Sequence, residues 1–164
     1  MPRLLVVHHS PTRSLAALTE QVVAGANDPE LEGVEVTVRP ALDTSAEDLL
    51  AADGYVLGTS ANFGYMSGAL KHMFDSTFQE IGGALDPTGA ADPHASGTTA
   101  GKPFGLYVHG RYDTVGAVRS VLAITGALGW RQGYDVLSVL GDPQADDLEA
   151  GYTLGGTIAA LLGT

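Results

Sequence analysis

Short apolar runs alternate along the chain with segments of helical periodicity. The first run, Leu-Leu-Val-Val at residues 4–7, is typical of a strand buried on both faces. Apolar side chains then recur at helical spacing over residues 15–26, and Asn-Asp-Pro at residues 27–29 predicts the end of that helix. Residues 34–39 alternate apolar and polar side chains, which indicates an edge strand with one wetter face.

The same alternation continues towards the C-terminus. It predicts helices at residues 45–52, 67–79, 118–128 and 143–162, and strands at residues 55–58, 104–108 and 134–140. Ser45 and Asp48 predict a capping box for the first of these helices, and Asp142 before Pro143 predicts the start of the last one. Five strands and five helices predict an α/β fold with a doubly wound parallel sheet. We expect the strand order 2-1-3-4-5, although periodicity does not fix that order.

One segment interrupts this alternation of predicted strands and helices. Residues 82–102 are rich in Gly, Ala, Thr, Pro and Asp, and loops this long in compact domains are usually functional or disordered. We expect residues 1–164 to form one domain. Residues 82–102 would be a long flexible or lid-like insertion that covers the ligand or reaches a neighbouring subunit.

Composition and charge narrow the classes of function. Hydrophobic residues make up 45% of the 164 residues, which is enough for a packed core. No apolar run approaches the roughly 20 residues that span a bilayer. The first residues lack the features of a signal peptide, so we expect a cytoplasmic location. A net charge of −11 argues against nucleic acid and membranes as partners, because phosphates would repel the protein.

Side chains that perform chemistry directly are scarce. Cysteine is absent, which excludes disulfides, thiolate metal sites and a cysteine nucleophile. His8, His72 and His94 have no metal-ligand spacing with one another or with carboxylates, so no metal is expected. Ser10 lacks a nucleophile-elbow motif. We therefore predict no catalytic side chain.

The first candidate loop lies at residues 9–14, between a strand and a helix. Ligands of open α/β sheets bind at the carboxyl ends of the strands, where this loop begins. The hydroxyls of Ser10, Thr12 and Ser14, the guanidinium of Arg13 and the helix N–H groups together suit a phosphate. The alternative is an ordinary Ser/Thr cap beside a solvated arginine. The loop lacks the glycines of a P-loop or of a nicotinamide-binding motif.

The second candidate loop follows the third predicted strand. Phe63 and Tyr65 lie just beyond the strand, beside Asn62 and Gly64. An aromatic pair beside an amide suits a flat heteroaromatic ring, which stacks and is hydrogen-bonded at its edge. The alternative is that Phe63 and Tyr65 cover the top of the core while Ser67 caps the next helix.

Residues 58–75, Gly-Thr-Ser-Ala-Asn-Phe-Gly-Tyr-Met-Ser-Gly-Ala-Leu-Lys-His-Met-Phe-Asp, carry a family resemblance. They resemble the second flavin loop of the WrbA-like branch of flavodoxin-fold proteins, in which Pro-Thr-x-Phe-Gly-x-Met-Ser-Gly leads into a helix. Residues 101–108, Gly-Lys-Pro-Phe-Gly-Leu-Tyr-Val, resemble the start of that family's fourth strand. The layout of the whole chain is similar, but only residues 58–75 are distinctive. The resemblance implies a flavodoxin-like three-layer fold that binds FMN.

By this resemblance three loops hold FMN. The FMN-binding residues would be Ser10, Thr12, Arg13 and Ser14 in the first loop, Ser60, Ala61, Asn62, Phe63 and Gly64 in the second, and His109, Gly110, Arg111 and Tyr112 in the third. In the third loop Tyr112 would stack on the ring, and Arg111 or His109 would stabilise negative charge on the reduced flavin. The alternative is a solvated turn in which Asp113 or Thr114 caps the next helix.

Members of this family include NAD(P)H:quinone oxidoreductases, FMN reductases and electron-carrier flavodoxins. The leading expectation is an oxidoreductase in which NAD(P)H reduces bound FMN by hydride transfer and a quinone-like small-molecule electron acceptor is then reduced. The resemblance also implies a homo-oligomer as a candidate assembly. One alternative is a non-enzymatic electron-transfer flavodoxin, which the acidic charge would suit. Another is a binding module that has lost FMN, because Pro11 removes one N–H from the phosphate loop.

Overall fold

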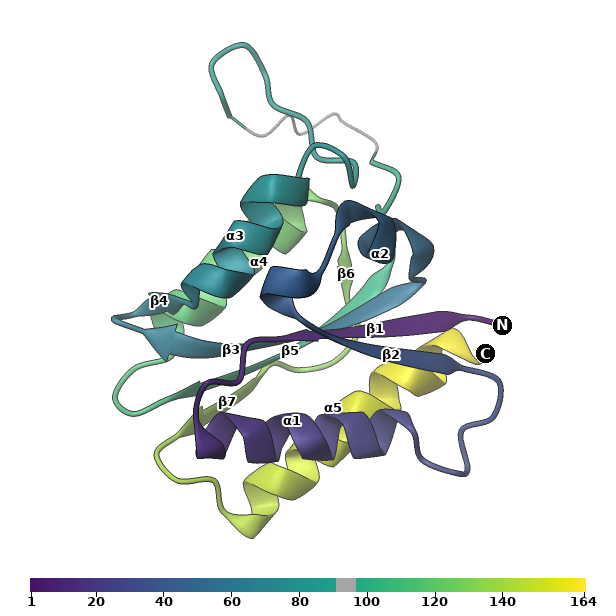
Figure 1. The fold of residues 1–164 in the computed structure, drawn as a ribbon, viewed down its shortest axis with the longest axis vertical. Helices are drawn as coiled ribbons and strands as arrows, with labels where there is room; N and C mark the ends of the chain where they lie inside the picture. The colour runs from purple at the N-terminus through teal and green to yellow at the C-terminus, as the bar shows by residue number, and fades with distance from the viewer. Residues whose placement is uncertain (91–96) are drawn as a thin grey trace.

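The computed structural model describes residues 1–90 and 97–164, which include a sheet with helices on both faces (Figure 1). The strands are β1 (Arg3–His8), β2 (Glu35–Pro40), β3 (Gly54–Asn62), β4 (Tyr65–Met66), β5 (Pro103–Gly110), β6 (Arg131–Gln132) and β7 (Leu137–Leu140). The helices are α1 (Arg13–Ala26), α2 (Ala46–Ala51), α3 (Gly68–Thr77), α4 (Val115–Ala127) and α5 (Ala145–Leu162), with a short 3-10 helix η1 at Ala41–Asp43.

The sheet has the order β2-β1-β3-β5-β6, and β7 pairs with the second half of β5. These strands run parallel, and β4 alone pairs antiparallel, with the end of β3. The predicted doubly wound, flavodoxin-like order is confirmed, because β6 and β7 together take the place of the fifth strand. The predicted edge position of the second strand is confirmed as well.

The fifth strand differs from the prediction in its extent. Residues 133–136 are not strand, and β6 begins at Arg131, before the predicted start at residue 134. The side-chain amide of Gln132 donates to the carbonyl of Tyr134 at 3.0 Å. This bond stabilises a bend at Tyr134, which divides the strand into β6 and β7.

The two predicted helix starts have different outcomes. Ser45 and Asp48 form the predicted capping box at the start of α2. The predicted cap at Asp142 is wrong, because α5 begins after Gln144, whose N–H donates to Asp147 Oδ2 at 2.8 Å. Asp142 instead accepts a hydrogen bond from Arg111 Nη2 at 3.0 Å.

Each face of the sheet packs against its own helices (Figure 1). Leu4 and Val6 of β1 belong to a buried cluster with α1 and α5, whereas Leu5 and Val7 belong to a cluster with α2, α3 and α4. Successive side chains of a strand point to opposite faces. The near-continuous apolar run at residues 4–7 therefore supplies both cores, as predicted for a strand buried on both faces.

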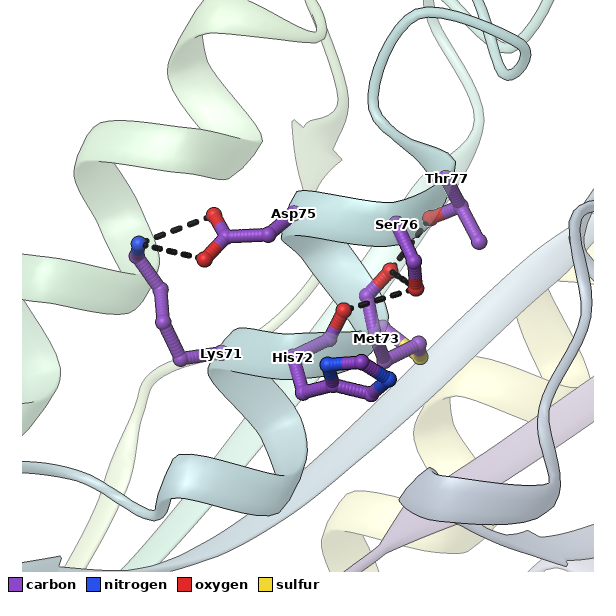
Figure 2. Close-up of polar contacts among 6 residues, drawn as sticks. All are labelled: Lys71, His72, Met73, Asp75, Ser76 and Thr77. Carbon is purple, nitrogen blue, oxygen red and sulfur yellow. Dashed lines mark hydrogen bonds and ion pairs between the residues drawn. The ribbon is translucent and has the colours of Figure 1, made fainter.

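Polar side chains of α3 bind within their own helix (Figure 2). Lys71 Nζ lies 2.8 Å from Asp75 Oδ1, and the hydroxyl of Ser76 donates to the carbonyl of His72 at 2.7 Å. Leu70, Met73, Phe74 and Thr77 form the opposite, buried face of the helix, as the periodicity predicts.

The predicted lid segment leaves α3 at its C-terminal end, away from the β3–β4 turn (Figure 1). Its described residues 97–102 precede the amino end of β5, where the hydroxyl of Thr99 accepts a hydrogen bond from Trp130 Nε1 at 2.8 Å. Residues 91–96, which the lid prediction includes, lie outside the described residues. Within the described ranges, no helix has the length and apolar character required to cross a membrane.

Candidate cofactor-binding site

A cavity of about 460 Å³ lies at the carboxyl edge of the sheet. Three distant segments line it, namely Thr12 and Ser14, residues 60–64, and residues 109–113. They meet because β1, β3 and β5 are parallel neighbours, and parallel strands end at the same edge of a sheet. The volume is within the range of small-molecule sites.

The cavity collects the sequence-predicted site residues with two exceptions, Ser10 and Arg13. Arg13 is exposed as the first residue of α1. The hydroxyl of Ser10 contacts His8 and Thr19. Asp113, which was predicted only as a helix cap, also lines the cavity.

The start of α1 forms one wall of the cavity and suits an anion. Thr12 is the N-cap, and its Oγ1 accepts the N–H of Leu15 at 3.3 Å. The first turn of the helix has free N–H groups, lies at the positive end of the helix dipole and contains no acidic residue. The hydroxyls of Thr12 and Ser14 add donors to this wall. It therefore suits a phosphate, even though Pro11 supplies no N–H.

Two aromatic side chains that line the cavity are almost fully exposed to solvent. Relative exposure is 109% for Phe63 and 93% for Tyr112. Tyr65 is 44% exposed. The interpretation that Phe63 covers the core is therefore wrong. Exposure of an aromatic ring to water is unfavourable, and stacking against a flat ligand ring would remove that cost.

Phe63 and Gly64 form the two-residue turn between β3 and β4. Their φ angles are 51° and 77°, as a type I′ hairpin turn requires at both positions. Glycine adopts such angles freely, whereas a side-chain-bearing residue costs about 1–2 kcal/mol. Phe63 is the only non-glycine residue with positive φ in the described ranges. Backbone strain of this kind is concentrated at functional sites.

Ser60 lines the cavity, and its buried hydroxyl has no hydrogen-bond partner. The residue is only 7% exposed, and its Oγ has no hydrogen-bond partner, unlike every other buried side-chain N or O atom of the described residues. Such a group costs about 1–3 kcal/mol when it is left unpaired. A polar ligand atom that reached this oxygen would remove the cost. Ser60 stands where the family motif has proline, and it is one of the residues that the sequence predicts to bind FMN.

The third loop combines both predicted roles. His109 Nε2 lies 2.7 Å from the Gly141 carbonyl, which holds the ring against the loop before α5. Arg111 pairs with Asp142 at 3.0 Å, and because both are exposed the pair contributes little stability. Asp113 Oδ1 accepts the N–H of Val115 at 2.8 Å. The loop therefore lines the cavity and also caps α4.

A chain of hydrogen bonds lies behind the first loop. The hydroxyl of Tyr107 lies 2.6 Å from Thr19 Oγ1, which lies 2.8 Å from Ser10 Oγ, which lies 2.9 Å from His8 Nδ1. Burial lowers the pKa of His8, so its neutral form predominates at neutral pH. A tyrosine within the apolar fourth predicted strand was the available signal, since a buried tyrosine hydroxyl needs a partner.

These features together fit FMN. The start of α1 suits its phosphate, the exposed rings of Phe63 and Tyr112 suit its flavin, and Ser60 Oγ offers a hydrogen bond. Among residues 1–90 and 97–164, there is no group of three or more His, Cys, Asp or Glu residues that could hold a metal ion.

Known proteins resemble this chain in sequence or in fold. No family model matches the chain. A flavodoxin of Aquifex aeolicus (strain VF5) is 30% identical over 129 residues, which cover 71% of this chain and 69% of that relative. A flavodoxin from the domain Archaea has a TM-score of 0.78 at 18% identity, over 99% of both chains. A flavodoxin, WrbA-like protein from Agrobacterium tumefaciens has a TM-score of 0.71 at 17% identity, over 99% of this chain and 98% of that one. The two structures share the fold, and the identity and coverage of the Aquifex relative show that the chain belongs to the flavodoxin family.

Proposed function

We propose that this chain is an electron-transfer flavodoxin, which carries electrons between redox partners through bound FMN. FMN is the cofactor of flavodoxins. The observation that carries the proposal is the cavity, which joins the start of α1, the unpartnered hydroxyl of Ser60 and the exposed rings of Phe63 and Tyr112. When bound, FMN supplies the redox chemistry, and the protein binds it, orients it and tunes it.

The chain's own residues divide this work. Thr12, Ser14 and the first N–H groups of α1 would hold the phosphate. Phe63 and Tyr112 would contact the flavin ring, and Ser60 Oγ would form a hydrogen bond with it or with its side chain. The net charge of −11 would speed the approach of positively charged redox proteins.

The second candidate is an NAD(P)H-dependent oxidoreductase of the WrbA-like branch, which was the leading expectation from the sequence. The motif at residues 58–75 and the fold of the Agrobacterium protein favour it. The Aquifex relative favours the carrier, because that relative is named a flavodoxin. We therefore place the electron carrier first. The homo-oligomer and the cytoplasmic location stay predictions.

The cofactor is tested by adding FMN to the purified protein. We expect flavin absorbance to elute with the protein on gel filtration. We also expect a higher Tm with FMN, because a ligand that binds only the folded state stabilises it. A protein that retains no flavin and shows no thermal shift would contradict both the carrier and the oxidoreductase, and would leave the binding module that has lost FMN.

Steady-state assays separate the two candidates. With NADH or NADPH and a quinone, the carrier alone should consume almost no nicotinamide. Addition of a separate NADPH-dependent flavoprotein reductase, with cytochrome c as final acceptor, should make cytochrome c reduction depend on the concentration of this chain. Rapid nicotinamide consumption by the chain alone would instead support the oxidoreductase.

A further inference from the structure

Gly116, the second residue of α4, lies against the turn between β3 and β4. A β-carbon at residue 116 would lie 1.9 Å from the carbonyl oxygen of Gly64 and 3.0 Å from its carbonyl carbon. Both are backbone atoms, so neither can rotate away as the end of a side chain can. The present spacing between α4 and the turn therefore requires glycine at residue 116.

The side chains of the turn itself make few contacts, whereas Met66 of the adjacent β4 is buried in the core. The ring of Phe63 is fully exposed, and a β-carbon at Gly64 would meet no atom within 4 Å. The positive φ of Phe63 is unfavourable for a residue with a side chain. The position of the turn therefore depends on the short β3–β4 pairing, on the buried Met66 of β4 and on the backbone contact with Gly116.

Helix α4 is joined directly to another segment that lines the cavity, residues 109–113. Val115, the neighbour of Gly116, donates its N–H to Asp113 Oδ1 at 2.8 Å, and Tyr112 immediately precedes Asp113. The same first turn thus contacts the segment that carries Phe63 and continues into the segment that carries Tyr112. A shift of the turn relative to α4 would therefore change the spacing between two segments that line the cavity.

We propose that Gly116 is a positioning residue that sets the width of the FMN cavity by letting the Gly64 carbonyl lie against the first turn of α4. The inference rests on the proposed binding of FMN. Gly116 does not itself line the cavity and acts through Gly64. The carbonyl oxygen lies near the positive end of the helix dipole, which favours the contact.

Gly116→Ala tests the proposal, and Gly126→Ala is the matched control. Gly126 lies in the same helix, and a β-carbon there would meet no atom within 4 Å. For Gly126→Ala we expect the wild-type Kd for FMN. For Gly116→Ala we expect the Kd to rise about tenfold or more. The absorption maximum and the midpoint potential of bound FMN should also shift, because its surroundings change.

The outcomes separate this inference from the proposed function. Wild-type Kd, spectrum and potential in Gly116→Ala would overturn the positioning role. Loss of apoprotein stability with unchanged Kd and spectrum would also overturn it, because the contact would then serve the fold alone. A wild-type protein that fails to bind FMN would overturn the proposed function itself, which the Gly116 comparison could not do.

A second measurement covers the case in which Gly116→Ala does not fold. Amide hydrogen exchange of the wild-type protein would be followed with and without FMN. We expect FMN to slow exchange in residues 61–66 and 114–118 together, because the two segments are in contact. Slower exchange in residues 61–66 alone would overturn the proposal.

Discussion

The hydroxyl of Tyr107 in β5 lies 2.6 Å from the hydroxyl of Thr19 in α1, and both residues are buried. The ring fits because residue 58 of the neighbouring strand β3 is glycine, where a β-carbon would lie 2.1 Å from Tyr107 Cζ. Thr19 in turn contacts Ser10, which contacts His8. The side chain of Ser10 is therefore oriented by the core of the protein.

Replacing Tyr107 with Phe should destabilise the apoprotein. The change leaves the buried hydroxyl of Thr19 with Ser10 as its remaining partner in the chain, and the net loss of one hydrogen bond costs about 0.5–1.5 kcal/mol. Urea unfolding measures the free energy of unfolding. Tyr134→Phe is the control, since Tyr134 is 42% exposed and its change should have little effect. Equal stability of Tyr107→Phe and wild type would contradict the importance of this bond.

The stability of the apoprotein should fall as the pH drops below about 6.5. Burial lowers the pKa of His8, with a smaller contribution from His9. The unfolded chain therefore binds a proton near pH 6.5, whereas the folded chain binds it only at lower pH. The contribution of His8 is complete above that pH and is lost on acidification through the lowered pKa.

Urea midpoints measured between about pH 7.5 and about pH 5 would show this loss of apoprotein stability. His8→Asn is the informative variant, because its amide can still reach Ser10 but does not titrate. We expect the urea midpoint of His8→Asn to depend less steeply on pH in this range than that of the wild type. If the urea midpoints of His8→Asn and wild type depend equally on pH, the loss of stability is due to other titratable groups.

Ser60→Ala should separate ligand binding from folding. Removal of an unpartnered buried hydroxyl should leave apoprotein stability unchanged or raise it by about 1 kcal/mol. FMN affinity should fall about threefold to tenfold, because the ligand loses one hydrogen bond. Flavin fluorescence titration gives the Kd, with Ser76→Ala on α3 as the control (Figure 2). A less stable apoprotein with unchanged Kd would show that Ser60 serves the fold.

Phe63→Gly should weaken FMN binding without loss of apoprotein stability. The exposed ring contributes nothing to the core, and glycine removes the strain of positive φ. Loss of the stacked ring should raise the Kd about tenfold. Phe63→Tyr keeps an aromatic ring and should retain most of the affinity. Wild-type affinity in Phe63→Gly would mean that the flavin lies elsewhere.

The pattern of residues determined the order of strands and helices along the chain, the α2 capping box and the three loops that we propose bind FMN. Periodicity and caps are properties of neighbouring residues, so they can be recognised without knowledge of distant contacts. Parallel strands then bring the loops to one edge, which explains why most predicted site residues line one cavity.

Only the tertiary structure decided how individual side chains are used. Ser10 is directed to Thr19 by a tyrosine 97 residues away, Ser60 is left without a partner, and Gly116 admits the Gly64 carbonyl. The division of the predicted fifth strand into β6 and β7 is likewise visible only in the tertiary structure. These features depend on distances between atoms far apart in the chain, and such distances follow from packing rather than from local pattern.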